Sequence, residues 1–136
     1  AAMSGARWNS PGRPVIYTSE HYATTILEQL VHVGRLLVPP GHHGAVIEIP
    51  DELLVATFVP AEHPGWDAPD SAVAVAVGDA WLQGGATPLL RVPSLPGQPV
   101  EWNLLINPLH AAFTRIRTGV AFSVRWDGRL FGMAVG

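Results

Sequence analysis

Residues 5–34 are GARWNSPGRPVIYTSEHYATTILEQLVHVG, a stretch that predicts a turn followed by a helix. Pro11 and Gly12 occupy the second and third positions of a type II turn, and the runs ARW and VIY on either side suit short strands. Apolar residues then recur with helical spacing, with Ser19 as the expected N-cap and Gly34 as the expected stop. The apolar positions are Tyr22, Ala23, Ile26, Leu27, Leu30 and Val31. The fold is therefore expected to begin with a hairpin and a helix that buries this apolar face.

The middle of the chain contains one strand pattern and two ambiguous segments. Residues 45–50, AVIEIP, alternate as a half-buried strand that ends at Pro50. Residues 51–58, DELLVATF, fit either a strand or a short turn followed by a strand. In residues 71–85, SAVAVAVGDAWLQGG, the Ala/Val alternation favours a strand, whereas a Ser71 cap, many alanines and the Gly84–Gly85 stop favour a helix.

The second half is rich in strand patterns. Strands are expected in residues 88–94, 100–108, 121–127 and 129–135. The dipeptide DG at 127–128 predicts a two-residue hairpin between the last two of these. Residues 110–118, HAAFTRIRT, predict a weak helix or an irregular link. The expected fold class is a single mixed α+β domain.

Composition excludes several classes of protein. The 136 residues fit one domain, and the absence of cysteine excludes disulfide scaffolds, thiolate zinc sites and thiol nucleophiles. A net charge of −3 without a basic cluster argues against direct nucleic-acid binding. No apolar run approaches the roughly 20 residues that span a bilayer, and no signal peptide is visible. The lack of cysteine is compatible with a reducing cytoplasm, which is the expected location. Only 14% of residues are charged, which suggests a protein partner or a homo-oligomer.

Simple catalytic templates are absent from the sequence. It has no GxSxG, HExxH, Walker or GxGxxG motif. The pair His42–His43 lies in a Gly/Pro loop, but adjacent histidines rarely bind one ion well, so no metal is expected. Ser94 follows Pro93 at the exit of a predicted strand, where loop serines usually bond nearby backbone. No His/Asp partner marks Ser94 as a nucleophile.

Glu28 belongs to a polar stripe on the predicted helix. It shares one helical face with His21, Thr24, Thr25 and His32, opposite the expected core face. Glu28 is either a solvated side chain on an exposed face or part of a cleft. In the second case the stripe faces the arms of the hairpin, which carry Arg7 and Tyr17.

Arg7, which precedes Trp8, also allows two interpretations. It is either a surface residue stacked on the indole or a planar guanidinium suited to phosphate or pyrophosphate. Strict pairing about SPGR places Arg7 opposite Ile16 and turns Tyr17 to the other face. A site shared by Arg7 and Tyr17 therefore requires a bulge or a looser loop.

Five runs, in this order, resemble the RES domain toxins of Xre–RES toxin–antitoxin pairs. They are ARWNSPGRPVIYTSEHYATTILEQLVH (6–32), GDAWL (78–82), LLRVPS (89–94), NLLINPLH (103–110) and WDGRLF (126–131). The resemblance covers nearly the whole chain, so residues 1–136 are expected to form one RES domain. Family members usually have an upstream segment with another arginine, whereas this chain has only six residues before Arg7.

The resemblance implies a fold and a reaction. The family's fold is similar to that of ADP-ribosylating toxins, with a split β core and flanking helices, and the run before GDAWL is helical in it. Its members consume NAD, cleaving the nicotinamide–ribose bond or moving ADP-ribose to a protein. The arginine, glutamate and serine of the family name fall on Arg7, Glu28 and Ser94, and Tyr17 matches a tyrosine ahead of the helix.

These matches imply a role for each residue. Glu28 would stabilise the oxocarbenium-like ribose, Arg7 would bind the pyrophosphate or a nearby phosphate, and Tyr17 would pack against nicotinamide or ribose. Ser94 would hydrogen-bond the nicotinamide–ribose end. The acceptor of ADP-ribose is a protein, water or phosphate, and the implied partner is an Xre-like antitoxin that covers the active site. The alternative is an interaction module that keeps the fold, has little catalytic activity and binds an antitoxin.

Overall fold

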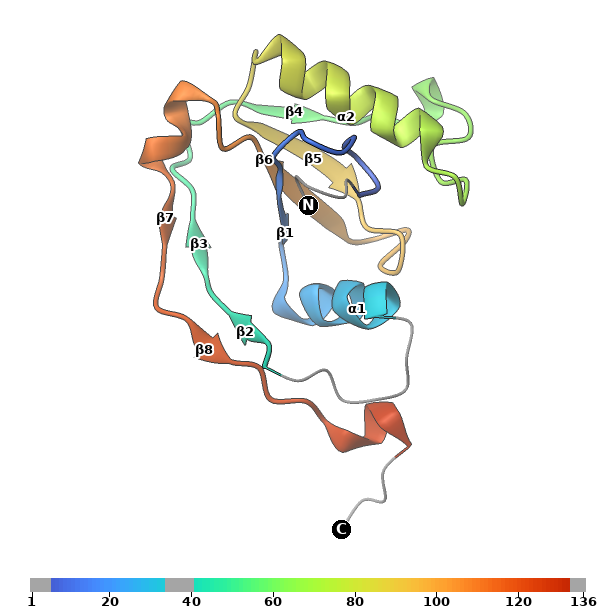
Figure 1. Cartoon of the computed structure of the whole chain (residues 1–136), viewed down its shortest axis with the longest axis vertical. Helices are drawn as coiled ribbons and strands as arrows, with labels where there is room; N and C mark the ends of the chain where they lie inside the picture. The colour runs from blue at the N-terminus through green and yellow to red at the C-terminus, as the bar shows by residue number, and fades with distance from the viewer. Residues whose placement is uncertain (1–5, 34–40, 133–136) are drawn as a thin grey trace.

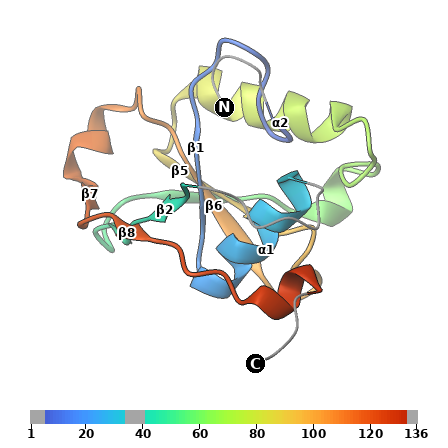
Figure 2. The same ribbon diagram turned by 60° about the horizontal axis from the view of Figure 1, so that its bottom comes forward.

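The computed structural model describes residues 6–33 and 41–132, and it confirms a mixed α+β domain (Figure 1). Its centre is a four-stranded sheet in the order β1-β6-β5-β4. The strands are β1 (Ile16–Ser19), β4 (Val55–Thr57), β5 (Leu89–Pro93) and β6 (Trp102–Ile106). β6 is antiparallel to both β1 and β5, whereas β4 and β5 are parallel. In Figures 1 and 2, β1 runs from the neighbourhood of helix α2 (Ala72–Gly84) to the start of helix α1 (Tyr22–Val33).

Helix α2 links the parallel strands β4 and β5, as a crossover between parallel strands requires. The helical interpretation of 71–85 is confirmed, and Gly85 ends the helix with a left-handed φ of 62°. Ser71 as a side-chain cap is wrong. Its φ is 60°, its side chain makes no cap bond, and Asp70 Oδ1 instead accepts from the Ala72 amide at 3.1 Å.

The main core lies where α2 and the N-terminal loop meet the sheet. Its aromatic part is formed by Trp8, Phe58 and Trp66, with the Trp8 and Phe58 rings 4.9 Å apart. The other buried members are Val15, Ala74, Leu90, Val92 and Leu105. A second buried cluster contains Leu53, Leu89 and Ile106. Leu89 and Leu90 are neighbours in β5 but belong to different clusters, because successive side chains of a strand point to opposite faces.

Two short antiparallel ribbons form an arm beside the sheet (Figure 1). One pairs β2 (His43–Gly44) with β8 (Phe122–Ser123), and the other pairs β3 (Ile47–Glu48) with β7 (Arg117–Thr118). The strand predicted in 45–50 is thus confirmed but short. Residues 51–58 are a turn followed by β4, and residues 110–118 contain the 3₁₀ helix η2 (Ala111–Arg115) followed by β7. A further 3₁₀ helix, η1 (Pro60–Glu62), lies between β4 and α2.

The predicted C-terminal hairpin is wrong within the described residues. Asp127 Oδ1 accepts a 3.0 Å hydrogen bond from the Arg129 amide, and this contact caps the 3₁₀ helix η3 (Gly128–Phe131). An Asx cap of this kind competes locally with a hairpin turn, which explains why the DG pattern misleads. The strand predicted in 129–135 continues past residue 132 and so lies partly outside the described residues. The helix stop predicted at Gly34 also lies outside them.

The N-terminal hairpin is also wrong, although its turn is confirmed. The Arg13 amide donates to the Ser10 carbonyl at 3.3 Å, and Gly12 has the positive φ of 85° that a type II turn requires. The segment before the turn is not a strand, however, because residues 6–9 close on themselves through an isolated bridge between Ala6 and Asn9. β1 pairs instead with β6, because this five-residue strand offers four successive backbone partners.

Helix α1 is rotated relative to the sequence prediction. Three of its apolar side chains, Tyr22, Leu27 and Val31, are 52%, 43% and 65% exposed. Thr24 of the polar stripe is buried, and Glu28 is half-buried. The predicted Ser19 cap is wrong as well, because Ser19 is the last residue of β1, two positions before the residue that precedes α1, and its hydroxyl donates to Asn103 Oδ1. Thr24 and Glu28 of the polar stripe therefore face the body of the protein, whereas His21 and Thr25 remain exposed.

Candidate active site

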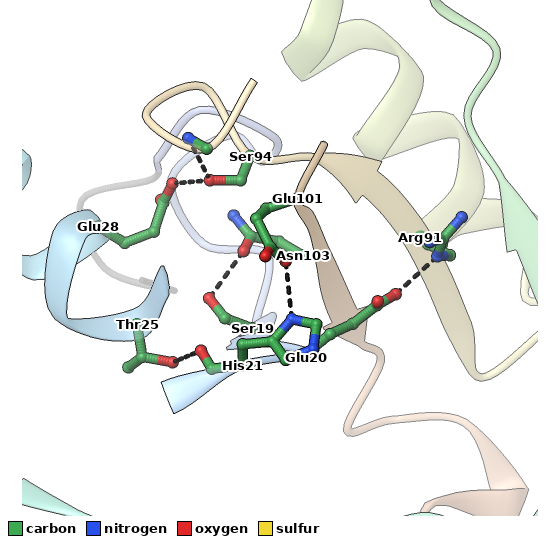
Figure 3. A network of polar contacts seen from close by, with 10 residues as sticks. Ser19, Glu20, His21, Thr25, Glu28, Arg91, Ser94, Glu101 and Asn103 are labelled. Atoms are coloured by element: carbon green, nitrogen blue, oxygen red, sulfur yellow. Dashed lines mark hydrogen bonds and ion pairs between the residues drawn. The ribbon is translucent and has the colours of Figure 1, made fainter. Parts of the chain in front are cut away.

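The candidate site is centred on a hydrogen bond between α1 and the loop after β5 (Figure 3). The Ser94 hydroxyl donates to Glu28 Oε1 at 2.8 Å, across 66 positions of sequence. Of the two interpretations of Glu28, the solvated side chain is therefore wrong. Its carboxylate is half-buried and bonded through one oxygen, which leaves lone pairs on the other for an incoming hydroxyl.

Ser94 is held by a compact loop. The residue is fully buried, its amide donates to the Glu101 carbonyl at 3.0 Å, and its hydroxyl accepts from the Gly97 amide at 3.2 Å. Gly97 is packed so tightly that a β-carbon there would lie 2.6 Å from the Glu101 β-carbon and 3.1 Å from Ser94 Oγ. The hydroxyl proton of Ser94 is thereby directed at Glu28.

Three consecutive residues join β1 to α1, and each contacts the β5–β6 hairpin or its loop (Figure 3). The pairs are Ser19 with Asn103 at 2.7 Å, Glu20 with Arg91 at 2.6 Å, and His21 with Glu101 at 2.7 Å. Such contacts fix the start of α1 relative to the loop that holds Ser94. The position of Glu28 therefore depends on several contacts besides its own hydrogen bond.

Tyr17 is linked to the segment that carries Arg7. Its phenol accepts from the Trp8 amide at 3.2 Å and donates to the side-chain oxygen of Asn9. Burial raises the pKa of the Tyr17 phenol to about 12, an effect that the Trp8 hydrogen bond opposes and the charge of Asp79 reinforces. Tyr17 therefore stays a neutral phenol at physiological pH.

The guanidinium of Arg7 is held by backbone carbonyls. Nη1 donates to Trp66 and Ala68 at 3.2 Å each, and Nη2 donates to Ala68 at 3.3 Å. None of the ion pairs among the described residues includes Arg7. Its charge is thus oriented by the loop but not neutralised by a carboxylate, which suits it to an anionic ligand.

Helix α2 positions the loop of Arg7 through two residues of the GDAWL run. A β-carbon at Gly78 would lie 1.7 Å from the Trp8 carbonyl oxygen, so only glycine allows this close approach. Asp79 accepts from the Ser10 amide at 2.9 Å and from the Ser10 hydroxyl, and it lies 3.8 Å from Arg13 Nε. The sequence analysis assigned no role to either residue, although both belong to the GDAWL run that resembles the family.

Four predicted site residues thus form two contacting groups. Glu28 bonds Ser94, while Tyr17 bonds the residue next to Arg7. β1 connects the groups, because Tyr17 and Ser19 point to one face of the strand about 7 Å apart. The looser loop that a shared site requires is present, since β1 pairs with β6 rather than with the Arg7 segment.

Asn103 is a further polar residue that the sequence analysis missed. It lies opposite Ser19 in the register of β1 and β6, and it is only 9% exposed. The sequence contained a clue to its importance, because Asn103 begins the NLLINPLH run that resembles the family. An asparagine at a buried strand position is uncommon and calls for a specific partner.

Two other features lie outside this site. A hollow of about 550 Å³ is lined by Glu48, Ile49, Pro50, Thr114, Arg115 and Arg117, and it includes none of the predicted site residues. Within residues 6–33 and 41–132, no group of three or more His, Asp or Glu side chains is arranged to hold a metal ion. His42 instead contacts Gln29 at 3.3 Å. No helix in the described part of the chain is long and apolar enough to cross a membrane.

Comparison with known proteins gives a consistent result. The family model described as the RES domain matches residues 1–127. The chain belongs to the RES domain family. The "Prs ADP-ribosylating toxin" of Sphingobium sp. (strain YBL2) is 40% identical to this RES domain protein over 138 residues, covering 98% of this chain and 85% of the relative. The "Toxin Res" of Yersinia enterocolitica is 33% identical over 133 residues, covering 96% and 86%.

Proposed function

We propose that this RES domain protein consumes NAD by cleaving the bond between nicotinamide and ribose, and that it passes ADP-ribose to a protein, water or phosphate. The observation that supports this most is the Ser94–Glu28 hydrogen bond, which holds a half-buried carboxylate at the junction of α1 and the sheet. The name of the Sphingobium relative supports the same reaction class.

The chemistry needs one well-placed carboxylate more than a strong acid. Nicotinamide leaves as a neutral base, while positive charge develops on the ribose as in glycoside cleavage. Glu28 would stabilise that charge and accept a hydrogen bond from a ribose hydroxyl. Ser94 would orient Glu28 and contact the same end of the substrate. The unneutralised guanidinium of Arg7 would attract the pyrophosphate, and Tyr17 would pack beside the ribose or nicotinamide.

An Xre-like antitoxin that covers the site is the partner we propose, and the cytoplasm is the place of action. The exposed apolar side chains of α1, Tyr22, Leu27 and Val31, support a protein partner close to Glu28. DNA would then be contacted only through the antitoxin. In this proposal the antitoxin inhibits the enzyme by closing access to NAD.

The test is release of nicotinamide from NAD labelled in both halves. Wild-type protein should release it, while Glu28→Gln should lower kcat by about 100-fold or more because the developing charge loses its counter-charge. Glu62→Gln, at an exposed position of η1, is the matched control and should keep full activity. Assays with and without phosphate and cell lysate identify the acceptor. Equal, background-level turnover by wild type and Glu28→Gln, with no labelled protein, would support the non-catalytic interaction module instead.

A further inference from the structure

Asn103 presents half of its carboxamide to the protein and leaves the other half without a partner. Its Oδ1 accepts the Ser19 hydroxyl at 2.7 Å. Its Nδ2 carries two N–H donors, and none of them is bonded within the described residues. Nδ2 is nevertheless accessible, because the only fully enclosed and unpaired side-chain atom in the described part of the chain is Nδ1 of His42.

Asn103 is 91% covered, and a side-chain amide at such a position calls for specific partners. Its Oδ1 has one in Ser19, whereas its accessible Nδ2 can donate to water or to a ligand. If position 103 of β6 served only to pack the core, an apolar residue would suffice there, as Leu105 does two residues later. An amide kept at this position, with its donor end accessible, is therefore suited to contact a ligand.

The surroundings of Asn103 define the kind of ligand. The Ser19 hydrogen bond turns Oδ1 away, and in Figure 3 Nδ2 is turned towards the side where Glu28 and Ser94 meet. A donor is thus presented beside a carboxylate acceptor. A phosphate would suit the donor but would be repelled by Glu28, and an apolar ring would use neither group. A pair of neighbouring hydroxyls suits both, since each hydroxyl can donate and accept.

We infer that Asn103 is a substrate-contact residue whose Nδ2 donates to one hydroxyl of the nicotinamide-side ribose, while Glu28 accepts from the neighbouring hydroxyl. This inference rests on the proposed NAD-consuming function and adds a specificity determinant to it. Ser19 is then a positioning residue, because its hydrogen bond fixes which end of the carboxamide faces the substrate.

The kinetic test uses two changes at Asn103. Asn103→Asp keeps the shape and the acceptor for Ser19 but removes the donor, whereas Asn103→Ala removes both. Each should lower kcat/KM for NAD about 10- to 100-fold, the range expected when one buried hydrogen bond to substrate is lost. Ser19→Ala should lower it less, because Nδ2 is retained. The conservative Asn103→Gln should recover part of the activity of Asn103→Ala, which a purely structural role would not predict.

Analogues of NAD locate the contact. With NAD lacking either the 2′- or the 3′-hydroxyl of the nicotinamide-side ribose, the loss caused by Asn103→Ala should shrink to about twofold for one of the two. An equal loss with NAD and both analogues would overturn the contact with ribose. It would instead favour the nicotinamide carboxamide or a structural role.

A binding measurement keeps the two proposals separate. In Glu28→Gln protein, NAD should shift the side-chain amide resonance of Asn103, which is assigned by its absence in Asn103→Asp. No shift at saturating NAD, or unchanged kcat/KM in both Asn103 variants of an active enzyme, overturns the inference alone. If wild type neither turns over nor binds NAD, the proposed function itself is wrong.

Discussion

Gly78 of α2 lies against the backbone of Trp8, so closely that a β-carbon at position 78 would stand 1.7 Å from the Trp8 carbonyl oxygen. The two residues belong to segments 70 positions apart, and their contact fixes the loop that presents Arg7. Because the obstacle is backbone and not a flexible side chain, it cannot give way locally. The glycine in the GDAWL run is therefore a requirement of the candidate site.

Gly78→Ala should destabilise the protein even though alanine is the better helix former. The gain in helix propensity is about 1 kcal/mol, while forcing a methyl group into this contact costs about 1–3 kcal/mol and moves the Arg7 loop. Denaturant unfolding measures the stability, and nicotinamide release measures the site. Gly84→Ala, at the last residue of the same helix and with nothing within 4 Å, is the matched control. Equal stability of the two variants would refute the steric account.

Gly97→Ala should reduce activity more than stability. The added β-carbon would lie 2.6 Å from that of Glu101 and 3.1 Å from Ser94 Oγ, so the loop must open and displace the Ser94 hydroxyl from Glu28. If Ser94 orients the carboxylate, kcat should fall about tenfold with little change in KM for NAD. Val100→Ala, at a 74% exposed position of the same loop, should leave both constants unchanged. A variant with normal kcat would show that the Ser94 hydroxyl does not act through Glu28.

Stability should fall at alkaline pH through Tyr17. Burial raises the pKa of this phenol from 10.0 to about 12 in the folded protein. Because the folded-state pKa lies above the unfolded value, the contribution to stability is complete below pH 10 and is lost as the pH rises to about 12. The free energy of unfolding measured across this window should decline in wild type and in Tyr22→Phe. In Tyr17→Phe this part of the decline should be missing, and its persistence would assign it to another group.

The sequence predicted the elements better than their orientation. The 71–85 segment was ambiguous by propensity, since the Ala/Val alternation fits a strand as well as a helix. Only the family resemblance favoured the helix there. In α1 the existence of the helix was predictable, but its rotation was not. Periodicity assigns the apolar face to the core, whereas Thr24 is buried here and Glu28 turns inward, where Ser94 of the loop after β5 donates to it.

In the candidate site, too, the residue types were predictable from the sequence but their arrangement was not. The residue types of Arg7, Tyr17, Glu28 and Ser94 could be named from the sequence, but their contacts depend on strand pairing across long separations. The local SPGR turn favoured a hairpin, and no local pattern indicates that Ser19 lies opposite Asn103. The residues that hold the site, Asp79 and Asn103, stand inside the recognisable runs. Their roles follow only from what they touch in three dimensions.

The pairing of β1 with β6 has a consequence for how the protein is made. Among the described residues, β6 is the only neighbour of β1 in the sheet, and it leaves the ribosome more than eighty positions after β1. Until then Ser19 lacks Asn103, and Glu28 lacks a loop fixed between two completed strands. A nascent or prematurely ended chain therefore carries Arg7, Tyr17 and Glu28 without the assembled candidate site. If the proposed function holds, the order of synthesis delays any consumption of NAD until β6 has been made.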